Sequence, residues 1–208
     1  MDETGIFPPE YFDKQDRSDD SQFYSFPRKV VHIDDGAINT VSSYFARLLP
    51  PGGTYLDLMS SWRTHLPAAL RPETVVGLGM NAEEMADNPQ LNEYIVHDLN
   101  REPELPFDSV TFDAVLCTVS VQYLQQPVAV FAEVNRVLKP GGVFIVTFSN
   151  RCFPTKAVAV WLVTSDQQHT ALVSRYFELA GDWRDITAES KQPRRGDPLY
   201  AVWAFKDR

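Results

Sequence analysis

The chain has 208 residues, of which 44% are hydrophobic and 23% are charged, and this composition suits one α/β domain with an ordinary core. Its formal charge is −9 and no basic stripe runs along it, which argues against nucleic acid as a partner. The chain has no apolar run long enough to span a bilayer, no basic and then apolar leader, and only two cysteines, so we expect a cytoplasmic protein without membrane insertion or a disulfide framework.

Residues 1–30 form a distinct opening segment. It mixes acidic and aromatic side chains with Pro8, Pro9 and Pro27, which oppose helix formation. Because disordered tails contain few aromatic residues, we expect an irregular arm that packs on the domain formed by residues 31–208. Two roles stay open for this arm: it covers a ligand cleft, or it only covers an apolar patch.

Helices and strands then alternate along the chain. Apolar spacing and capping signals predict helices at residues 35–49, from Trp62 to about 70, at 81–85, 127–138 and 154–163, and after the capping box 165–168. Strands are predicted at residues 54–58, 75–79, 94–97, 112–118, 143–148, 183–189 and 199–206.

The character of these strands predicts the fold. Nearly continuous apolar strands indicate a parallel sheet with both faces covered. The linker 190–198 is too short for a helical crossover, so the last two strands are expected to be antiparallel. The predicted fold is therefore α/β and Rossmann-like, with a doubly wound, mostly parallel, seven-stranded sheet that ends in a C-terminal antiparallel strand pair.

The strand 54–58 organises the predicted site. Asp57 lies at its carboxyl end, and ligands of open α/β sheets bind at that edge, where the first strand meets the switch in strand order. The small residues Ser60 and Ser61 allow the backbone to approach a ligand, and the N–H groups of a following helix point into the same space. The sequence therefore predicts a ligand site centred on the turn after this strand.

Two other stretches carry a family resemblance. Residues 105–115 are similar to the segment LPFPDNSFDAV of the class I S-adenosylmethionine-dependent methyltransferases, and residues 131–142 resemble their segment FxExxRVLKPGG. The resemblance covers about residues 36–150, with 151–208 similar in topology only, and the subgroup resembled is the small ubiquinone/menaquinone-type and generic small-molecule methyltransferases. It implies a methyltransferase domain over residues 31–208 that binds S-adenosylmethionine and transfers its methyl group directly to a small molecule.

The resemblance also implies a cofactor site at the carboxyl ends of the strands. Asp57 matches the acid that helps fix the methionine part of the cofactor, and Asp98 matches the acid that usually holds the adenine amino group, with Leu99 beside it. The other positions that match the cofactor-binding motifs are Met59, Ser60, Ser61, Gly79, Met80, Asn81, Thr118, Val119 and Ser120. In the arm, Tyr24 and Arg28 are predicted to reach the cofactor, Arg28 by pairing with its carboxylate.

The chain departs from the family pattern at two of these places. The turn after the first strand reads Met-Ser-Ser where the family has glycines, which adopt positive φ without steric cost. The acid that grips the ribose hydroxyls in the family falls near Gly79 here, and Asn81 is expected to replace it with a weaker contact. These departures keep one alternative open, a catalytically silent binding protein on the same fold.

Catalytic side chains are less well specified than the cofactor site. Methyl displacement depends mainly on aligning the nucleophile with the methyl carbon, so no dedicated catalytic group is required. If the nucleophile needs a base, His32 is the candidate, weighed against a surface or capping histidine, and Tyr123 is a second candidate on the substrate side. No histidine or cysteine has metal-ligand spacing and no G-x-G-x-x-G motif is present, so we predict neither a metal site nor a nicotinamide cofactor.

Overall fold

The computed structural model describes residues 6–207, which contain one seven-stranded sheet in the order β3-β2-β1-β4-β5-β7-β6. The strands are β1 (Thr54–Leu58), β2 (Thr74–Gly79), β3 (Glu93–Val96), β4 (Phe112–Thr118), β5 (Leu138–Phe148), β6 (Trp183–Lys191) and β7 (Leu199–Lys206). The first five run parallel, and β7 pairs antiparallel with both β5 and β6. The predicted α/β, Rossmann-like sheet with its antiparallel end is therefore confirmed.

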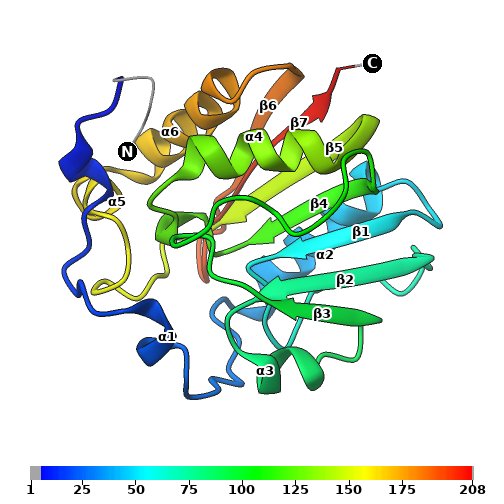
Figure 1. Ribbon diagram of the computed structural model, residues 1–208, viewed down its shortest axis with the longest axis horizontal. Coiled ribbons are helices and arrows are strands. Elements are labelled where there is room, and N and C mark those ends of the chain that lie inside the picture. Colours follow the sequence, from blue (N-terminus) through cyan, green and yellow to red (C-terminus); the bar gives the residue numbers. More distant parts are fainter. Residues whose placement is uncertain (1–5, 208) are drawn as a thin grey trace.

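Helices cover both faces of this sheet (Figure 1). They are η1 (Pro9–Phe12), α1 (Asp20–Phe23), α2 (Asp35–Leu48), α3 (Ala82–Ala86), η2 (Val121–Tyr123), α4 (Pro127–Val137), α5 (Ala159–Val163) and α6 (Asp166–Leu179). Neighbouring residues of β1 show the two layers, because Leu56 packs in the core that contains α4 and α6 whereas Tyr55 packs in the core that contains α2. No helix within residues 6–207 is both long and apolar enough to cross a membrane.

One predicted helix is wrong. The chain from Trp62 to Leu70 is an extended loop with a single turn, and His65 adopts a left-handed φ of 63° that a helix does not allow. Side-chain hydrogen bonds hold this loop: the Thr64 hydroxyl donates to Asp57, and Ser42 Oγ donates to the His65 carbonyl oxygen. Contacts with neighbouring elements therefore override the local helix propensity.

Two further bounds differ from the sequence expectation by about five residues, and the others by no more than two. Only residues 159–163 of the predicted helix 154–163 are helical, because the preceding segment pairs with the N-terminal arm through the Asp16 N–H and the Thr155 carbonyl oxygen. Strand β5 begins at Leu138 instead of residue 143, directly after α4, so the Lys-Pro-Gly-Gly sequence that ends the helix is already extended. The capping box at Ser165 is confirmed at the start of α6.

The described part of the arm, residues 6–30, contains two short helical turns, η1 and α1, and its first five residues lie outside the described chain. Its two halves do different things. Phe7 and Phe12 pack edge-on and tilted against Tyr176 of α6, with ring centroids 5.9 and 6.3 Å away. Further along, Tyr24 and Arg28 line a cavity at the sheet edge. The arm thus covers an apolar patch with one half and a cleft with the other, while the domain boundary at residue 30 stays a prediction.

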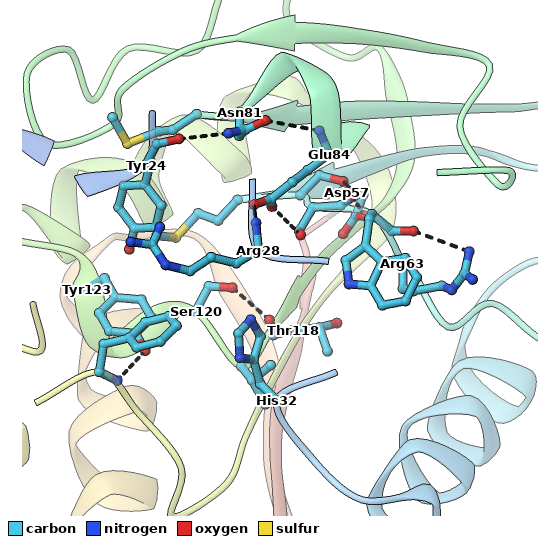
Figure 2. A pocket seen from close by; sticks show the side chains of 18 of the residues that line it. Tyr24, Arg28, His32, Asp57, Arg63, Asn81, Glu84, Thr118, Ser120 and Tyr123 are labelled. Atoms are coloured by element: carbon cyan, nitrogen blue, oxygen red, sulfur yellow. Dashed lines mark hydrogen bonds between the residues drawn. The ribbon is translucent and has the colours of Figure 1, made fainter. Parts of the chain in front are cut away.

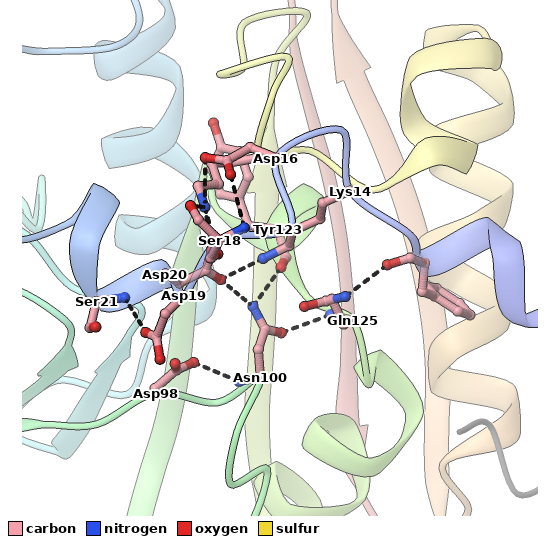
Figure 3. A network of polar contacts seen from close by, with 12 residues as sticks. Lys14, Asp16, Ser18, Asp19, Asp20, Ser21, Asp98, Asn100, Tyr123 and Gln125 are labelled. Carbon is pink, nitrogen blue, oxygen red and sulfur yellow. Dashed lines mark hydrogen bonds and ion pairs between the residues drawn. The ribbon is translucent and has the colours of Figure 1, made fainter.

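A buried network of charges fixes the middle of the arm (Figure 3). The Asp20 carboxylate accepts from Lys14 Nζ at 2.5 Å and from Lys156 Nζ at 3.1 Å, and both lysines are almost fully buried. Lys156 also pairs with Asp16 at 3.0 Å. Burial acts to raise the pKa of Asp20, but hydrogen bonds from Lys14 and Asn100 outweigh it and hold that pKa below its usual value. Because buried charges are tolerated only when they are paired, this network indicates that the arm packs in one defined position on the domain.

Candidate cofactor and substrate site

A cavity of about 400 Å³ lies at the carboxyl ends of β1, β2 and β4, on the side where the strand arrowheads point toward the arm (Figures 1 and 2). This volume falls in the ~300–1,000 Å³ range of small-molecule sites. The arm and residues 151–153 form its outer wall. The predicted site residues all line it: Tyr24, Arg28, His32, Asp57, Met59, Ser60, Ser61, Gly79, Met80, Asn81, Asp98, Leu99, Thr118, Val119, Ser120 and Tyr123. Their separate roles in binding and catalysis stay predictions.

Asp57 lies at the inner end of the cavity and is 3% exposed. Ser60 Oγ and Thr64 Oγ1 both donate to its Oδ2, at 2.6 and 2.8 Å. Burial raises the pKa of Asp57 to about 6, although these two hydrogen bonds act to lower it. Oδ1 has no hydrogen-bond partner within residues 6–207, so this oxygen is available to a donor on a ligand.

The turn after β1 adopts the glycine conformation without glycine. Met59 has a φ of 57°, in the left-handed region, whereas Ser60 and Ser61 do not have positive φ. The positive φ that glycine adopts without cost therefore falls on Met59, and a left-handed non-glycine residue costs roughly 1–2 kcal/mol. Such strain at a cavity wall is typical of functional turns, where the surrounding structure holds a residue in place.

Gly79 shows why this chain has no acid at the end of β2. A Cβ atom at Gly79 would lie 2.3 Å from the Ser60 carbonyl oxygen, so no side chain fits between the β1 turn and β2. Asn81, the expected substitute, caps α3 by accepting from the Glu84 N–H at 3.0 Å and donates to the Tyr24 carbonyl oxygen at 2.8 Å. The oxygen and the nitrogen of the Asn81 side-chain amide therefore each already have a hydrogen-bond partner in the protein.

Glu84 is a cavity residue that the sequence reasoning missed. It lies in the first turn of α3, is 9% exposed, and accepts from the Arg28 N–H at 2.6 Å and from Ser61 Oγ at 2.5 Å. A signal was available: the third residue after a helix N-cap points back over the helix start, and Asn81 was already the expected N-cap. Glu84 therefore adds a carboxylate beside the position where Gly79 lacks one.

Asp98 follows β3 and faces the cavity next to the buried Leu99. Its Oδ1 accepts from the Asn100 N–H at 2.9 Å, which fixes the turn. The Asn100 side chain in turn donates to Asp20 of the arm and to the Tyr123 carbonyl oxygen, each at 3.0 Å (Figure 3). The turn that carries Asp98 is thus joined by hydrogen bonds to Asp20 and so to the buried charge network that holds the arm.

The segment after β4 forms another wall of the cavity. Val119 has a φ of 48°, and its N–H donates to the Thr147 carbonyl oxygen at 2.7 Å. Ser120 Oγ donates to the Thr118 carbonyl oxygen at 2.6 Å. Thr118 Oγ1 is buried and has no hydrogen-bond partner in the described chain, which marks a polar position beside the cavity that protein groups leave unsatisfied.

The two candidate catalytic side chains differ in what they can do. The Tyr123 hydroxyl accepts from the Phe153 N–H at 2.9 Å, and burial raises its pKa to about 12, so it keeps its proton at neutral pH. His32 presents its accessible surface to the cavity, and partial desolvation lowers its pKa. A histidine that is neutral at pH 7 can accept a proton, so His32 fits the role of base better than Tyr123.

Comparison with known proteins agrees with this geometry. Residues 63–146 match the family model described as a methyltransferase domain. A search of curated protein sequences finds no match.

Solved structures resemble most of the chain at low sequence identity. A S-adenosylmethionine-dependent methyltransferase of Mesorhizobium loti is 17% identical, with a TM-score of 0.60 over 83% of this chain and 99% of that one. A protein of Pyrococcus horikoshii OT3 is 20% identical, with a TM-score of 0.61 over 89% and 99%. The cyclase SpnF is 15% identical, with a TM-score of 0.63 over 90% and 91%. Similarity at these identities establishes the fold. The chain therefore has the Rossmann-like fold of the class I methyltransferases, and its residues 63–146 match the methyltransferase-domain family.

Proposed function

We propose that the protein is a S-adenosylmethionine-dependent methyltransferase that acts on a small molecule by direct methyl displacement. One observation carries this proposal: an open cavity of about 400 Å³ at the switch in strand order, into which both Asp57 and Asp98 face. The ubiquinone/menaquinone-type subgroup and a cytoplasmic location belong to the same proposal. The unpaired cysteines Cys117 and Cys152 fit a reducing compartment.

The inner half of the cavity fits the charge of the cofactor. S-adenosylmethionine carries a sulfonium, an ammonium and a carboxylate, so it is a net cation. The inner half offers three carboxylates, those of Asp57, Glu84 and Asp98. Asp57 Oδ1 fits the ammonium group, whereas Asp98 and Leu99 fit the adenine edge and ring.

The proposed chemistry asks for binding, alignment and exclusion of water. The cofactor supplies an electrophilic methyl group when bound. Asp57 and Asp98 would hold the two ends of the cofactor, so that its methyl group has one orientation. The arm would exclude water, since Tyr24 and Arg28 line the cavity and the buried ion pair of Asp20 with Lys14 holds the arm in place. Alignment of this kind supplies on the order of 7–11 kcal/mol of rate enhancement.

The alternative of a silent binding protein is not favoured. It predicts that side chains fill the cofactor space, and the space is open. The missing glycines are its best support, yet Met59 adopts the glycine conformation.

Calorimetric titration with S-adenosylmethionine and S-adenosylhomocysteine tests the proposal. We expect micromolar binding of both, and Asp98→Ala is expected to weaken it at least about tenfold through loss of a hydrogen bond to a charged group. Asp108→Ala, which removes an exposed carboxylate outside the cavity, is the matched control and leaves the affinity unchanged. Absence of binding by the folded wild-type protein at millimolar ligand contradicts the proposal.

A further inference from the structure

The outer half of the cavity has the opposite electrostatic character to the inner half. Three of its basic side chains, Arg28, His32 and Arg63, come from the arm and from the loop after β1. Three of the cavity's carboxylates, Asp57, Asp98 and Glu84, come from the strand ends and from α3, whereas Asp20 comes from the arm and is paired there with two buried lysines. The arginines of the arm side and the carboxylates of the sheet side thus line the same cavity.

Arg28 and Arg63 are the cavity arginines that no carboxylate pairs with in the described chain, and Arg28 is the one of the two that is partly buried. Its guanidinium donates to the Phe23 carbonyl oxygen at 2.6 Å and to that of Phe26 at 3.3 Å, and it lies over the Phe23 ring at 4.1 Å. Within residues 6–207 no carboxylate lies within ion-pair distance of this guanidinium. Arg151, which also lines the cavity, differs because it is paired with Asp197 at 2.9 Å. A partly buried guanidinium with donors to spare recognises a carboxylate, which matches its planar fork.

Aromatic rings surround this guanidinium, with Phe153 at their centre. The Phe153 ring lies 5.4 Å from that of Phe23, 5.2 Å from that of His32 and 6.1 Å from that of Tyr123, and the Arg28 guanidinium is 5.8 Å from it. Figure 2 shows Arg28, His32 and Tyr123 pointing toward one space. Flat walls of this kind bind flat rings by stacking and edge-to-face contact.

The arm adds exposed apolar surface to the same wall. Val30 is 55% exposed and Val31 is 50% exposed, and both line the cavity. The Trp62 indole, whose Nε1 donates to the Val30 carbonyl oxygen at 3.0 Å, lines it as well. An apolar and aromatic lining with a partly buried guanidinium that has no carboxylate partner in the described chain suits a ligand that is mostly ring with one acidic group.

We propose that the outer half of the cavity binds the methyl acceptor as an aromatic carboxylate that carries a ring hydroxyl, with the carboxylate on Arg28 and the hydroxyl facing His32. This inference rests on the methyltransferase function proposed above and gives the substrate class of that site. It assigns Arg28 to the acceptor in place of the cofactor carboxylate with which the family resemblance paired it. An anionic acceptor on the arm side also complements a cationic cofactor on the sheet side, so the two ligands attract each other within the cavity.

The reaction balances with these groups alone. The hydroxyl oxygen of the acceptor forms a bond to the methyl carbon, the bond between that carbon and sulfur breaks, and its electron pair stays on sulfur. The hydroxyl proton passes to the His32 ring nitrogen, which releases it to water afterwards. The products are an aryl methyl ether and S-adenosylhomocysteine.

Calorimetry of the full chain, saturated with S-adenosylhomocysteine, tests the ligand class. The probes are 2-, 3- and 4-hydroxybenzoate, with two controls: 4-hydroxybenzamide, which is flat but neutral, and cyclohexanecarboxylate, which is anionic but not aromatic. We expect at least one hydroxybenzoate to bind about ten- to hundredfold more tightly than both controls, as a charge-assisted hydrogen bond and ring contacts predict. Equal binding of all probes, or none by any hydroxybenzoate, overturns the inference.

Two arginine variants separate acceptor binding from cofactor binding. Arg28→Met is expected to remove the preference for hydroxybenzoate over the neutral amide and to leave the affinity for S-adenosylhomocysteine within about threefold. Arg151→Met, whose charge Asp197 already neutralises, is the matched control and keeps the preference. If Arg28→Met instead weakens S-adenosylhomocysteine and keeps the preference, Arg28 holds the cofactor carboxylate and the inference is wrong. Failure of the wild-type protein to bind S-adenosylhomocysteine contradicts the proposed function itself, so the two failures are distinguishable.

Discussion

At the scale of single residues, Asp57 shows how burial changes a carboxyl group. Its pKa rises from the usual 3.8 to about 6 because the group is desolvated. A pKa raised by folding means that the protonated form is favoured in the native state, so this contribution to stability is present below about pH 4 and is lost as the pH rises through about 6.

We therefore predict that Asp57→Asn flattens the pH dependence of stability. The wild-type free energy of unfolding should lose up to ~3 kcal/mol between pH 4 and pH 7 from this group, and the variant should not. Denaturant unfolding at a series of pH values measures the difference. Parallel curves for the two proteins would show that Asp57 titrates normally.

Glu84 and Glu83 form a natural pair of test and control on α3. Glu84 is buried and accepts hydrogen bonds from Arg28 and Ser61, whereas Glu83 pairs with Lys29 at the surface. Glu84→Gln is expected to destabilise the protein by about 1.5–3 kcal/mol because two donors lose a charged acceptor. Glu83→Gln removes the same charge and should leave denaturant unfolding unchanged within error. Equal effects of the two substitutions would count against a structural role for Glu84.

The sequence predicts those site residues that a local pattern marks, and it does not predict those that only tertiary contacts bring to the site. Asp57 and Asp98 were predictable because they lie at or just after the carboxyl ends of predicted strands. Phe153 was not, because nothing in its neighbours in sequence indicates that four side chains from elsewhere surround it. The requirement for glycine at position 79 was also invisible, since it depends on the distance between two turns.

At the scale of elements, the strands and the longer helices follow their apolar periodicity closely, with β1, β4 and β7 at the predicted bounds. The predicted helix after Trp62 fails because side chains of other elements stabilise an extended path there. A helix of this length is only marginally stable by itself, so such contacts are enough to prevent it from forming.

The arm allows a prediction at this scale, because its ion pair between Lys156 and Asp20 is buried whereas its ion pair between Arg17 and Asp13 is exposed. Lys156→Met leaves the Asp20 carboxylate with less compensation in a buried place and is expected to cost ~3–5 kcal/mol of unfolding free energy. Arg17→Met breaks the exposed pair with Asp13 and should change nothing measurable. Limited proteolysis should cut the arm faster in Lys156→Met only. An arm that is cut equally fast in both variants would mean that the buried network does not hold it.

At the scale of the whole molecule, ligand binding should appear as thermal stability. A ligand at one hundred times its dissociation constant adds ~2.7 kcal/mol, which in a chain of this size corresponds to a rise in Tm of roughly 5–10 °C. We expect S-adenosylhomocysteine to produce this shift and homocysteine alone to produce none. Differential scanning calorimetry measures it, and an unchanged Tm with saturating ligand would exclude the cavity as the binding site.

The position of β7 has a consequence for how the chain is made. Because β7 lies between β5 and β6, strand β6 leaves the ribosome before β7, the strand with which it pairs in the described sheet, has been made. At ~5–20 residues per second, the nascent protein spends about a second with an incomplete sheet whose β5 edge is open. The charged and polar side chains of β6 are then an asset, since they discourage β6 itself from pairing with another nascent chain before β7 arrives.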